Sequence, residues 1–379
     1  MDSFFVVTAP GLETLTAEEL RGLDLAPVAE PGGLTFKGDL AALYRANLHL
    51  RTASRVLARL GNFFYATTFP ELQKRASRLP WERFLTPGQP IALRVTCHKS
   101  KLYHSDAVAR TVSAALEERL GQPSPLVKAD EETDGPSPQL VIVRLVEDKC
   151  TVSVDSSGEL LHKRGYRQAV AKAPLRETLA AALLLASSWD KSAPLIDPFC
   201  GSGTIPIEAA MIALDIPPGL NRRFSFMDWP GFDSQQWETI RSETTPIYHS
   251  SFTVHHSILA SDRDAGAVKM ARENAERAGV ADFIDFKCQA VSSITPPAGP
   301  GWVVTNPPYG MRISAGKDLR NLYAQFGNVL RLHYPGWNVA VLCTDPILLG
   351  QMHLDLDTSF GFVNGGIAVR VARGMVKDK

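Results

Sequence analysis

The chain has 379 residues, 45% of them hydrophobic, and its 40 Lys and Arg balance 40 Asp and Glu. This is the composition of a globular protein of two or three domains, and it argues against extensive disorder and a uniformly basic coat. No apolar run is long enough to span a bilayer and no signal peptide is evident, so we expect a soluble cytoplasmic protein. The five cysteines are scattered and form no CxxC pair, which argues against a disulfide framework or a metal site.

The first 60 residues predict the order strand, helix, strand, helix. The expected elements are a β-rich strand at 4–8, a helix with regular leucine spacing at 12–23, a strand after Gly32-Gly33, and one long amphipathic helix at 40–60.

The next hundred residues predict a second α/β set. It comprises a strand at 90–98, a helix at 105–121 that Gly121 can end, an acidic connection at 130–138, and a strand pair at 139–158.

Positive charge is concentrated in residues 45–128, which hold 14 Lys and Arg against 5 Asp and Glu. Such a surplus suits a polyanion, because phosphate contacts supply most of the sequence-independent affinity for nucleic acids. Alternatively, Arg51, Arg55 and Arg59 cover one solvated face of a helix. The sequence does not decide between these two interpretations.

From residue 170 onward, helices and buried strands alternate. The expected order is helix 173–189, strand 193–199, helix 204–214, strand 257–262, helix 264–279, strand 283–287, strand 302–308, helix 318–334 and strand 337–343. This alternation predicts a doubly wound parallel sheet with helices on both faces. A hairpin near Asn364-Gly365-Gly366 is expected within 359–373.

The first motif with chemical meaning is DPFCGSGT at 197–204, between a buried strand and a helix. Small residues let a ligand approach the backbone there, and ligands of open α/β sheets bind at the carboxyl ends of strands. Pro206 replaces the third glycine of a dinucleotide fingerprint and no lysine completes a P-loop, so a cationic or amino-acid-bearing ligand fits better. We interpret Cys200 as a packing residue, since no cysteine accompanies the base-binding motif described below.

Asp262 ends the next strand, where an acid typically accepts hydrogen bonds from the hydroxyls of a ribose. The same residue can instead, or in addition, cap the helix that follows.

The most specific motif is Asn306-Pro307-Pro308-Tyr309, after a buried strand. An exocyclic amine on a base is a poor nucleophile, because its lone pair is delocalised into the ring. The side-chain oxygen of Asn306 and the carbonyl of Pro308, or one beside it, can bond both amine hydrogens and favour tetrahedral nitrogen as a methyl group arrives. Tyr309 offers a ring on which an extruded base can stack. A proline-rich turn without a role is the alternative.

Together, DPFCGSGT, SDRDAGAVKMARENAERAG and TNPPYG resemble the motifs of S-adenosylmethionine-dependent amino methyltransferases. APGLETLTAEEL, LYRANLHLRTASRVL, SKLYHSDAV and DSSGELLHKRGYR are similar to the bacterial THUMP-domain 23S rRNA guanine-N2 methyltransferases, over nearly the whole chain. The resemblance implies an α/β fold: a Rossmann-like doubly wound methyltransferase domain at 161–379, preceded by an α+β ferredoxin-like segment at 1–60 and an RNA-binding THUMP domain at 61–160. It implies metal-free methyl transfer from S-adenosylmethionine to a guanine N2 amine of 23S rRNA.

Carried onto this sequence, the resemblance assigns roles to individual residues. The methionine end of the cofactor is expected at Asp197, Phe199, Gly201, Ser202, Gly203 and Thr204, the ribose at Asp262, and the target base at Asn306, Pro307, Pro308 and Tyr309. Pro174, Leu175 and Thr178 match a helix that often closes the cofactor pocket. Gln289 stands near the place where such enzymes commonly have an acid for the adenine amine, which puts that contact in doubt.

RNA contacts are expected where cations and aromatic residues occur together. The candidates are Lys99, Lys101, His162, Lys163, Arg164, Tyr166 and Arg167, and a solvated turn is the alternative for the last five.

Other functions remain open. A tRNA guanine-N2 methyltransferase and a DNA adenine-N6 methyltransferase are the enzyme alternatives, and an RNA-binding assembly factor with a vestigial cofactor site is the non-enzyme alternative. Some family members continue into a second methyltransferase module, whose activity we do not expect from a chain of 379 residues. The sequence leaves the target guanine, the proton acceptor and the oligomeric state undecided.

Overall fold

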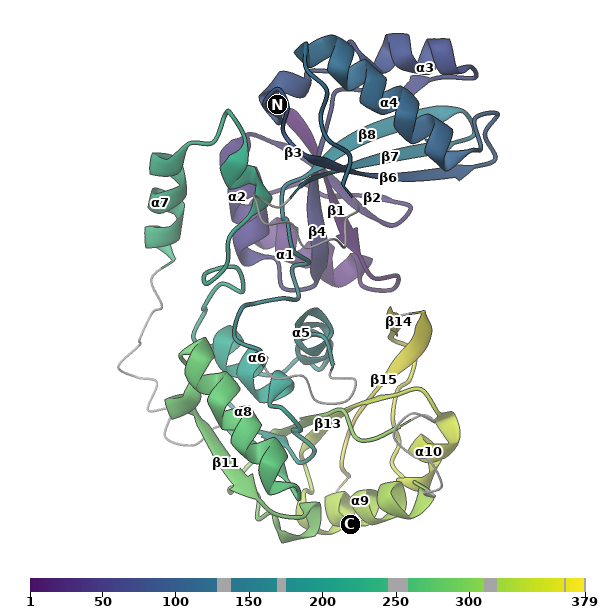
Figure 1. Ribbon diagram of the computed structural model, residues 1–379. Coiled ribbons are helices and arrows are strands. Elements are labelled where there is room, and N and C mark those ends of the chain that lie inside the picture. The colour runs from purple at the N-terminus through teal and green to yellow at the C-terminus, as the bar shows by residue number, and fades with distance from the viewer. Residues whose placement is uncertain (128–137, 169–174, 245–257, 310–318, 365, 378–379) are drawn as a thin grey trace.

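The computed structural model describes residues 1–127, 138–168, 175–244, 258–309, 319–364 and 366–377. Each half of the chain is built on its own β-sheet, and the two halves stack along the long axis of the molecule (Figure 1). None of the described helices is long and apolar enough to cross a membrane.

The first sheet has the strand order β2-β3-β1-β4-β8-β7-β6, with β5 paired to β8. Its strands are β1 Asp2–Thr8, β2 Val28–Glu30, β3 Gly33–Gly38, β4 Ala53–Arg59, β5 Phe64–Tyr65, β6 Ile91–His98, β7 Gln139–Val146 and β8 Lys149–Asp155. Its helices are α1 Glu13–Gly22, α2 Leu40–His49, α3 Phe69–Ala76 and α4 Ser105–Leu120. Because β4 pairs with β8, the segments before and after residue 60 share one continuous sheet.

The prediction of one long helix over residues 40–60 is wrong. α2 ends at His49, and the chain continues as β4, which pairs with β1 on one edge and β8 on the other. Leu57 and Ala58 are buried in the middle of the sheet. Pairing on both edges outweighs the local helical spacing, since strand formation depends on distant partners.

The three arginines of this segment therefore cover no helix face. Arg51 donates from its side chain to two backbone carbonyls of the second half, at 2.8 and 3.4 Å. Arg55 pairs with the buried Asp155, and Arg59 pairs with Glu30 at 3.2 Å. Part of the positive surplus thus stabilises the fold itself.

The second sheet has the order β11-β10-β9-β12-β13-β15-β14. Parallel strands β9 Leu195–Asp197, β10 Ile258–Asp262, β11 Ile284–Cys288, β12 Trp302–Thr305 and β13 Asn338–Cys343 are followed by antiparallel β14 Gly361–Asn364 and β15 Ile367–Met375. The helices are α5 Glu177–Ala186, α6 Thr204–Ala213, α8 Ala265–Ala278, α9 Arg320–His333 and α10 Pro346–Gln351. The expected acidic connection at 130–138 lies mostly outside the described residues, and so does Gly365 of the expected hairpin.

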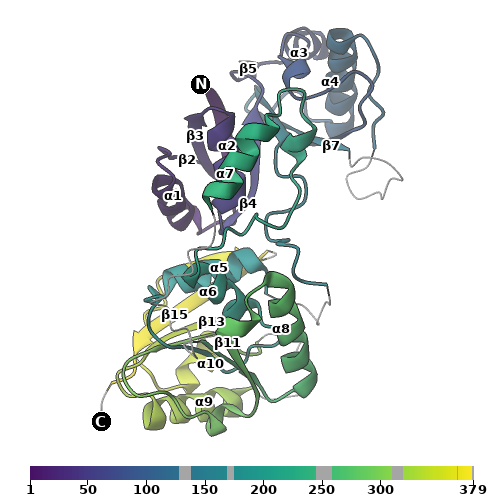
Figure 2. The same cartoon turned by 90° about the vertical axis from the view of Figure 1, so that its left-hand side faces the viewer.

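Alternate residues of the second sheet face two separate hydrophobic cores. Leu195 and Val304 pack with α5, α6 and α8, whereas Ile196 and Val303 pack with α9 and α10. The helices lie on opposite sides of the sheet (Figure 2). This confirms the predicted doubly wound α/β architecture.

Residues 216–244 depart from the second half and pack against the first. The segment carries α7 Ser234–Glu243, which lies beside α2 (Figure 1). The rings of Phe226 and Trp237 lie 4.6 and 6.0 Å from that of Tyr44 on α2. An insertion in the second half thus completes the hydrophobic core of the first.

Candidate active site

Three polar residues lie at the carboxyl ends of adjacent strands of the second sheet. Asp197 ends β9, Asp262 ends β10 and Asn306 follows β12. The chain moves from β9 to β10 on one side and returns to β12 on the other. Open α/β sheets bind ligands at such a switch point, so the fold brings the three predicted motifs to one edge.

Asp197 links the glycine loop to the proline loop. Its carboxylate is buried and accepts hydrogen bonds from the Thr305 hydroxyl at 2.6 Å and from the Phe199 backbone at 3.1 Å. Burial raises the pKa of Asp197 to about 7, and the neighbouring charge of Asp262 adds to the rise. Since Thr305 directly precedes Asn306, this bond holds the two loops side by side.

Asp262 is bonded through both carboxylate oxygens to backbone N–H groups, those of Gly201 at 3.1 Å and Asp264 at 3.0 Å. The side chain that caps α8 is Asp264, so the capping interpretation of Asp262 is wrong. Each carboxylate oxygen keeps acceptor capacity, and ribose binding stays a prediction. The backbone of Gln289 donates to the Asp262 carbonyl at 3.0 Å, which brings Gln289 to the same edge.

The glycine loop has one position set by packing and one open to a ligand. Gly203 has φ +85°, and a Cβ there would lie 2.9 Å from the Cβ of Ala271 on α8. A Cβ on Gly201 would meet nothing within 4 Å. Ser202, between them, is held through its carbonyl by Asn274 at 3.0 Å. The backbone at Gly201 is therefore accessible in a loop that is otherwise fixed.

The other predicted cofactor residues lie on the glycine loop itself or on the neighbouring helices. The ring of Phe199 packs edge-on against that of Phe326, and the hydroxyl of Thr204 accepts from Arg167 at 2.7 Å. Thr178 is buried in the first turn of α5, which packs against α6, whereas Pro174 lies outside the described residues.

Cys200 is buried beside the same loop. Burial raises the pKa of its thiol, and the nearby charges of Asp197 and Asp262 raise it further. The thiol is thus protonated at neutral pH and unsuited to nucleophilic attack, in agreement with its interpretation as a packing residue.

The proline loop holds a buried acceptor that has no partner among the described residues. The side-chain oxygen Oδ1 of Asn306 is buried and bonds to none of the described residues. The carbonyl of Pro308 accepts from the hydroxyl of Tyr323 at 3.3 Å, while Pro307 is buried and Tyr309 partly so. A buried acceptor without a hydrogen bond is costly, and such groups call for an explanation in function.

The segment 162–167, here called the junction segment, follows the first sheet and leads into the second half, and its side chains alternate between buried and exposed. Arg164 and Tyr166 are 3% and 4% exposed. Arg164 is 3.5 Å from the carboxylate of Glu208 and donates to the Arg51 carbonyl at 2.6 Å; the Tyr166 hydroxyl donates to Glu208 at 3.2 Å. The expectation that these two side chains contact RNA is therefore wrong, because both are buried and bonded within the protein.

The other members of the junction segment have different surroundings. Arg167 pairs with Glu177 at 3.0 Å and is mostly buried. Burial, followed by the charge of Arg176, lowers the pKa of His162 to about 4, so this residue is neutral at pH 7. Only Lys163 is exposed among the five, where it pairs with Glu159 at 2.6 Å. The ion-paired Arg167 and the neutral His162 therefore offer no free cation to RNA.

Lys99 and Lys101 lie in the first half of the molecule and are exposed, as an RNA contact requires. They follow β6 and precede α4, away from the edge that carries Asp197 and Asn306.

The sequence interpretation missed Thr305 and Tyr323, both of which fix the proline loop. Thr305 had a signal, because a polar residue at the end of an apolar strand needs a partner. No sequence pattern pointed to Tyr323, since its position in an amphipathic helix is equally typical of a core residue.

Models of three protein families match the chain. An RMKL-like methyltransferase domain matches residues 164–371, an RlmL ferredoxin-like domain matches 3–57, and a THUMP domain matches 66–155.

The chain is also similar to individual proteins over most of its length. It is 35% identical to the ribosomal RNA large subunit methyltransferase K/L of Syntrophotalea carbinolica over 97% of this chain, and spans about half (53%) of that relative. It is 37% identical to YpsC of Bacillus subtilis, named as an RNA methyltransferase, over 90% of this chain and 87% of that one. The crystal structure of SMU.472, titled a methyltransferase complexed with SAH, matches with a TM-score of 0.85, 30% identity, and coverage of 100% and 98%.

Proposed function

Because the chain belongs to the RMKL-like family of S-adenosylmethionine-dependent methyltransferases, we propose that it methylates the exocyclic N2 amine of a guanine in 23S ribosomal RNA. The RNA substrate is supported by the THUMP match and by the names of the relatives. The preference for guanine N2 rests on the motif resemblance.

The observation that carries the proposal is the buried oxygen of Asn306, which bonds to nothing in the described part of the chain. An acceptor kept without a partner is ready to bond an amine hydrogen, and the bond needs no rearrangement of the protein. The Thr305–Asp197 bond fixes this acceptor beside the glycine loop. An amine held there is oriented, and its lone pair is drawn out of conjugation with the base.

The residues of the sheet edge fit S-adenosylmethionine, which supplies a methyl group on a positively charged sulfur. We propose that Asp262 and Gln289 hold its adenosine portion and that the backbone of Gly201 accommodates its amino-acid portion. The unobstructed space at Gly201 supports this fit, and the carboxylate of Asp262 retains acceptor capacity.

We also propose the division into domains 1–60, 61–160 and 161–379. The shared first sheet and the return of 216–244 to the first half mean that these units do not pack as independent bodies.

The decisive experiment compares Asn306→Ala with the wild-type protein. Calorimetric titration should give S-adenosylmethionine binding within about threefold of wild type. Methyl transfer to rRNA from a deletion strain should fall by at least about a hundredfold, the typical effect of removing one positioned transition-state group. A variant with normal turnover would refute the role of the proline loop.

Mass spectrometry of nucleosides from the deletion strain identifies the product. One N2-methylguanosine lost from 23S rRNA supports the proposal. A loss confined to tRNA would make the chain a tRNA methyltransferase, and N6-methyladenine formed on duplex DNA would make it a DNA enzyme. No binding of S-adenosylmethionine would favour a non-catalytic assembly factor.

A further inference from the structure

One turn of the first half reaches into the second half. The β1–α1 turn, residues 9–12, places the fully buried Leu12 in the hydrophobic core that α5, α6 and α8 share. Phe362 of β14 belongs to the same core. β14 forms one edge of the second sheet, on the side of the second half that faces the first (Figure 1). The turn and this edge strand are therefore packed as one unit.

The same turn covers the free edge of β14. The backbone N–H of Val363 donates to the carbonyl of Pro10 at 3.0 Å. Gly11 has φ +96°, and a Cβ there would overlap the carbonyl oxygen of Gly361. Only glycine allows so close an approach, and a backbone group at a sheet edge needs a partner. The position of β14 is thus set from two sides, by β15 and by the first half.

β14 ends at a residue that holds the proline loop. This last residue, Asn364, is hydrogen-bonded through its side chain to the hydroxyl of Tyr309. The partly buried ring of Tyr309 packs against both cores of the second sheet. The loop is therefore held at Tyr309 as well as at Pro308, whose carbonyl accepts from Tyr323. A bond at the far end of the Tyr309 side chain restrains the tilt of its ring, which a bond to the backbone leaves free.

We propose that Asn364 positions Tyr309 and that the β1–α1 turn positions Asn364, so that the first half of the molecule shapes the pocket for the target base. This inference rests on the guanine methylation proposed above, in which the ring of Tyr309 stacks on the extruded base. Methyl transfer requires the base to be held in line, and a ring of fixed tilt provides that orientation. Asn364 and Gly11 are positioning residues, since they act through Tyr309.

The first test is a double-mutant cycle in the full-length protein, with rRNA from the deletion strain as substrate. Tyr309→Phe keeps the ring and Asn364→Leu keeps the side-chain volume, but both remove the same hydrogen bond. Each should lower kcat about fivefold, the typical effect of one neutral hydrogen bond. The double variant should lose no more than either single variant, because the bond can be lost only once. The KM for RNA should stay within about twofold of wild type, since phosphate contacts supply most of the affinity.

Controls separate positioning from damage to the fold. The melting temperature and the calorimetric affinity for S-adenosylmethionine should match wild type in both single variants. Met375→Ala removes an exposed side chain at the far end of β15 and should keep the wild-type kcat. A wild-type kcat in either single variant of the cycle would overturn the inference, as would losses that multiply in the double variant.

The second test compares two glycines of the first half. Gly11 and Gly32 have φ +96° and +91°, so alanine strains the backbone alike at both, but a Cβ on Gly32 would meet nothing within 4 Å. Gly11→Ala should lower kcat by up to about fivefold, and by nothing further in the Tyr309→Phe background, because it weakens the same hydrogen bond. Gly32→Ala should keep the wild-type kcat. If Gly11→Ala does not fold, Leu12→Val is the milder change in the same turn. Equal kcat values for the two turn variants and Gly32→Ala would overturn the role of the turn.

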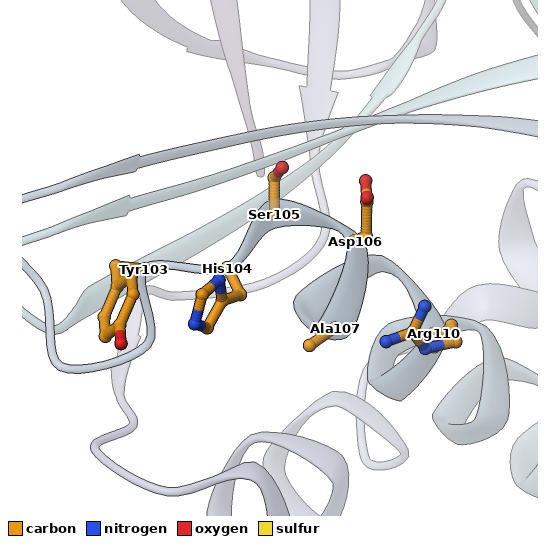
Figure 3. Close-up of a pocket in the computed structure, with 6 residues that line it drawn as sticks. All are labelled: Tyr103, His104, Ser105, Asp106, Ala107 and Arg110. Carbon is orange, nitrogen blue, oxygen red and sulfur yellow. The ribbon is translucent and has the colours of Figure 1, made fainter.

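Arg110→Ala controls for substitutions elsewhere in the first half. Arg110 lines a depression of about 420 Å³ at the start of α4, together with Tyr103 and His104 (Figure 3). α4 packs against β6, at the end of the first half remote from β14 (Figure 1). This variant should keep the wild-type kcat. A loss of kcat equal to that of Gly11→Ala would overturn the assignment to the β1–α1 turn.

Hydrogen exchange tests the contact between the turn and β14 without RNA. Peptides that cover β14 should exchange faster in Gly11→Ala than in wild type or Gly32→Ala, because the bond from Val363 to Pro10 is weakened. If rRNA is methylated and every variant keeps the wild-type kcat, the positioning role is wrong and the proposed function stands. If exchange responds as expected but no RNA is methylated, the function is wrong, and only the contact between the turn and β14 stands.

Discussion

Two segments of this chain have nearly the same composition and opposite surroundings. The junction segment 162–167 reads HKRGYR, and the segment 99–104 reads KSKLYH, so each contains histidine, tyrosine and cations. In the first, Arg164 and Tyr166 are buried between the two halves; in the second, Tyr103 and the lysines are exposed. Similar local chemistry therefore stabilises the fold at one place and leaves a surface free to bind at the other. Matched substitutions in the two segments can sharpen or break this contrast.

Substitution of Arg164 in the junction segment and of Lys101 in the segment 99–104 should give the largest difference in stability. Arg164→Met leaves the fully buried carboxylate of Glu208 without its cation and should lower the free energy of unfolding by about 3–5 kcal/mol. Arg164→Met/Glu208→Leu should recover part of this loss, because the carboxylate is removed together with its cation, whereas the buried Arg51 loses the attraction of Glu208. Lys101→Met should leave the urea midpoint unchanged. If the Arg164 and Lys101 variants unfold at the same urea concentration, the buried pair is not stabilising the junction.

The same substitution, tyrosine to phenylalanine, can be made at the buried Tyr166 and at the exposed Tyr103. Tyr166→Phe removes the hydroxyl that donates to Glu208, and a hydrogen bond to a charged group is worth about 1.5–3 kcal/mol. Tyr103→Phe removes an exposed hydroxyl and should change stability by less than about 0.5 kcal/mol. Thermal melts at pH 7.5 measure both. Equal melting temperatures for the two variants would show that the hydrogen bond from Tyr166 to Glu208 does not stabilise the fold.

The partly buried His162 should make the stability of the folded protein depend on pH. Since burial lowers the pKa of His162 to about 4, the unfolded chain binds a proton between pH 6.5 and 4 that the folded chain does not. This group therefore stabilises the folded state fully above pH 6.5, and that contribution is lost as the pH falls through the window. His162→Gln should lose less stability than wild type between pH 7 and pH 4.5. Urea midpoints across this range provide the measurement.

The smallest effect on stability is expected for substitutions of Lys163 and Lys99. Lys163 pairs with Glu159 on the surface, where such pairs contribute little, so Lys163→Ala should cost at most about 0.5 kcal/mol. Lys99→Ala should cost no more. A loss above 1 kcal/mol for Lys163→Ala would show that this end of the junction segment is also part of the packed interface.

Much of the second half could be predicted, because its strands are continuous apolar runs between amphipathic helices. The expectation that Asp197, Asp262 and Asn306 share an edge succeeded for a topological reason: the carboxyl ends of parallel strands meet there. The first half was less predictable. The helical spacing of 40–60 is a local signal, whereas β4 exists because β1 and β8, the latter almost 100 residues away, offer it hydrogen bonds.

The amino-acid order alone determined the alternation of strands and helices in the second half and the placement of its polar motifs at strand ends, because both are local patterns repeated along the chain. Only the tertiary structure decided which arginines and tyrosines are buried, and that the side-chain oxygen of Asn306 has no partner in the part of the chain that the structure describes. Glu208 meets Arg164 and Tyr166 across some 40 residues, and Asp148 joins residues 63–66 to 99–104. Burial and hydrogen bonding depend on such distant neighbours, so identical residue types acquire different roles.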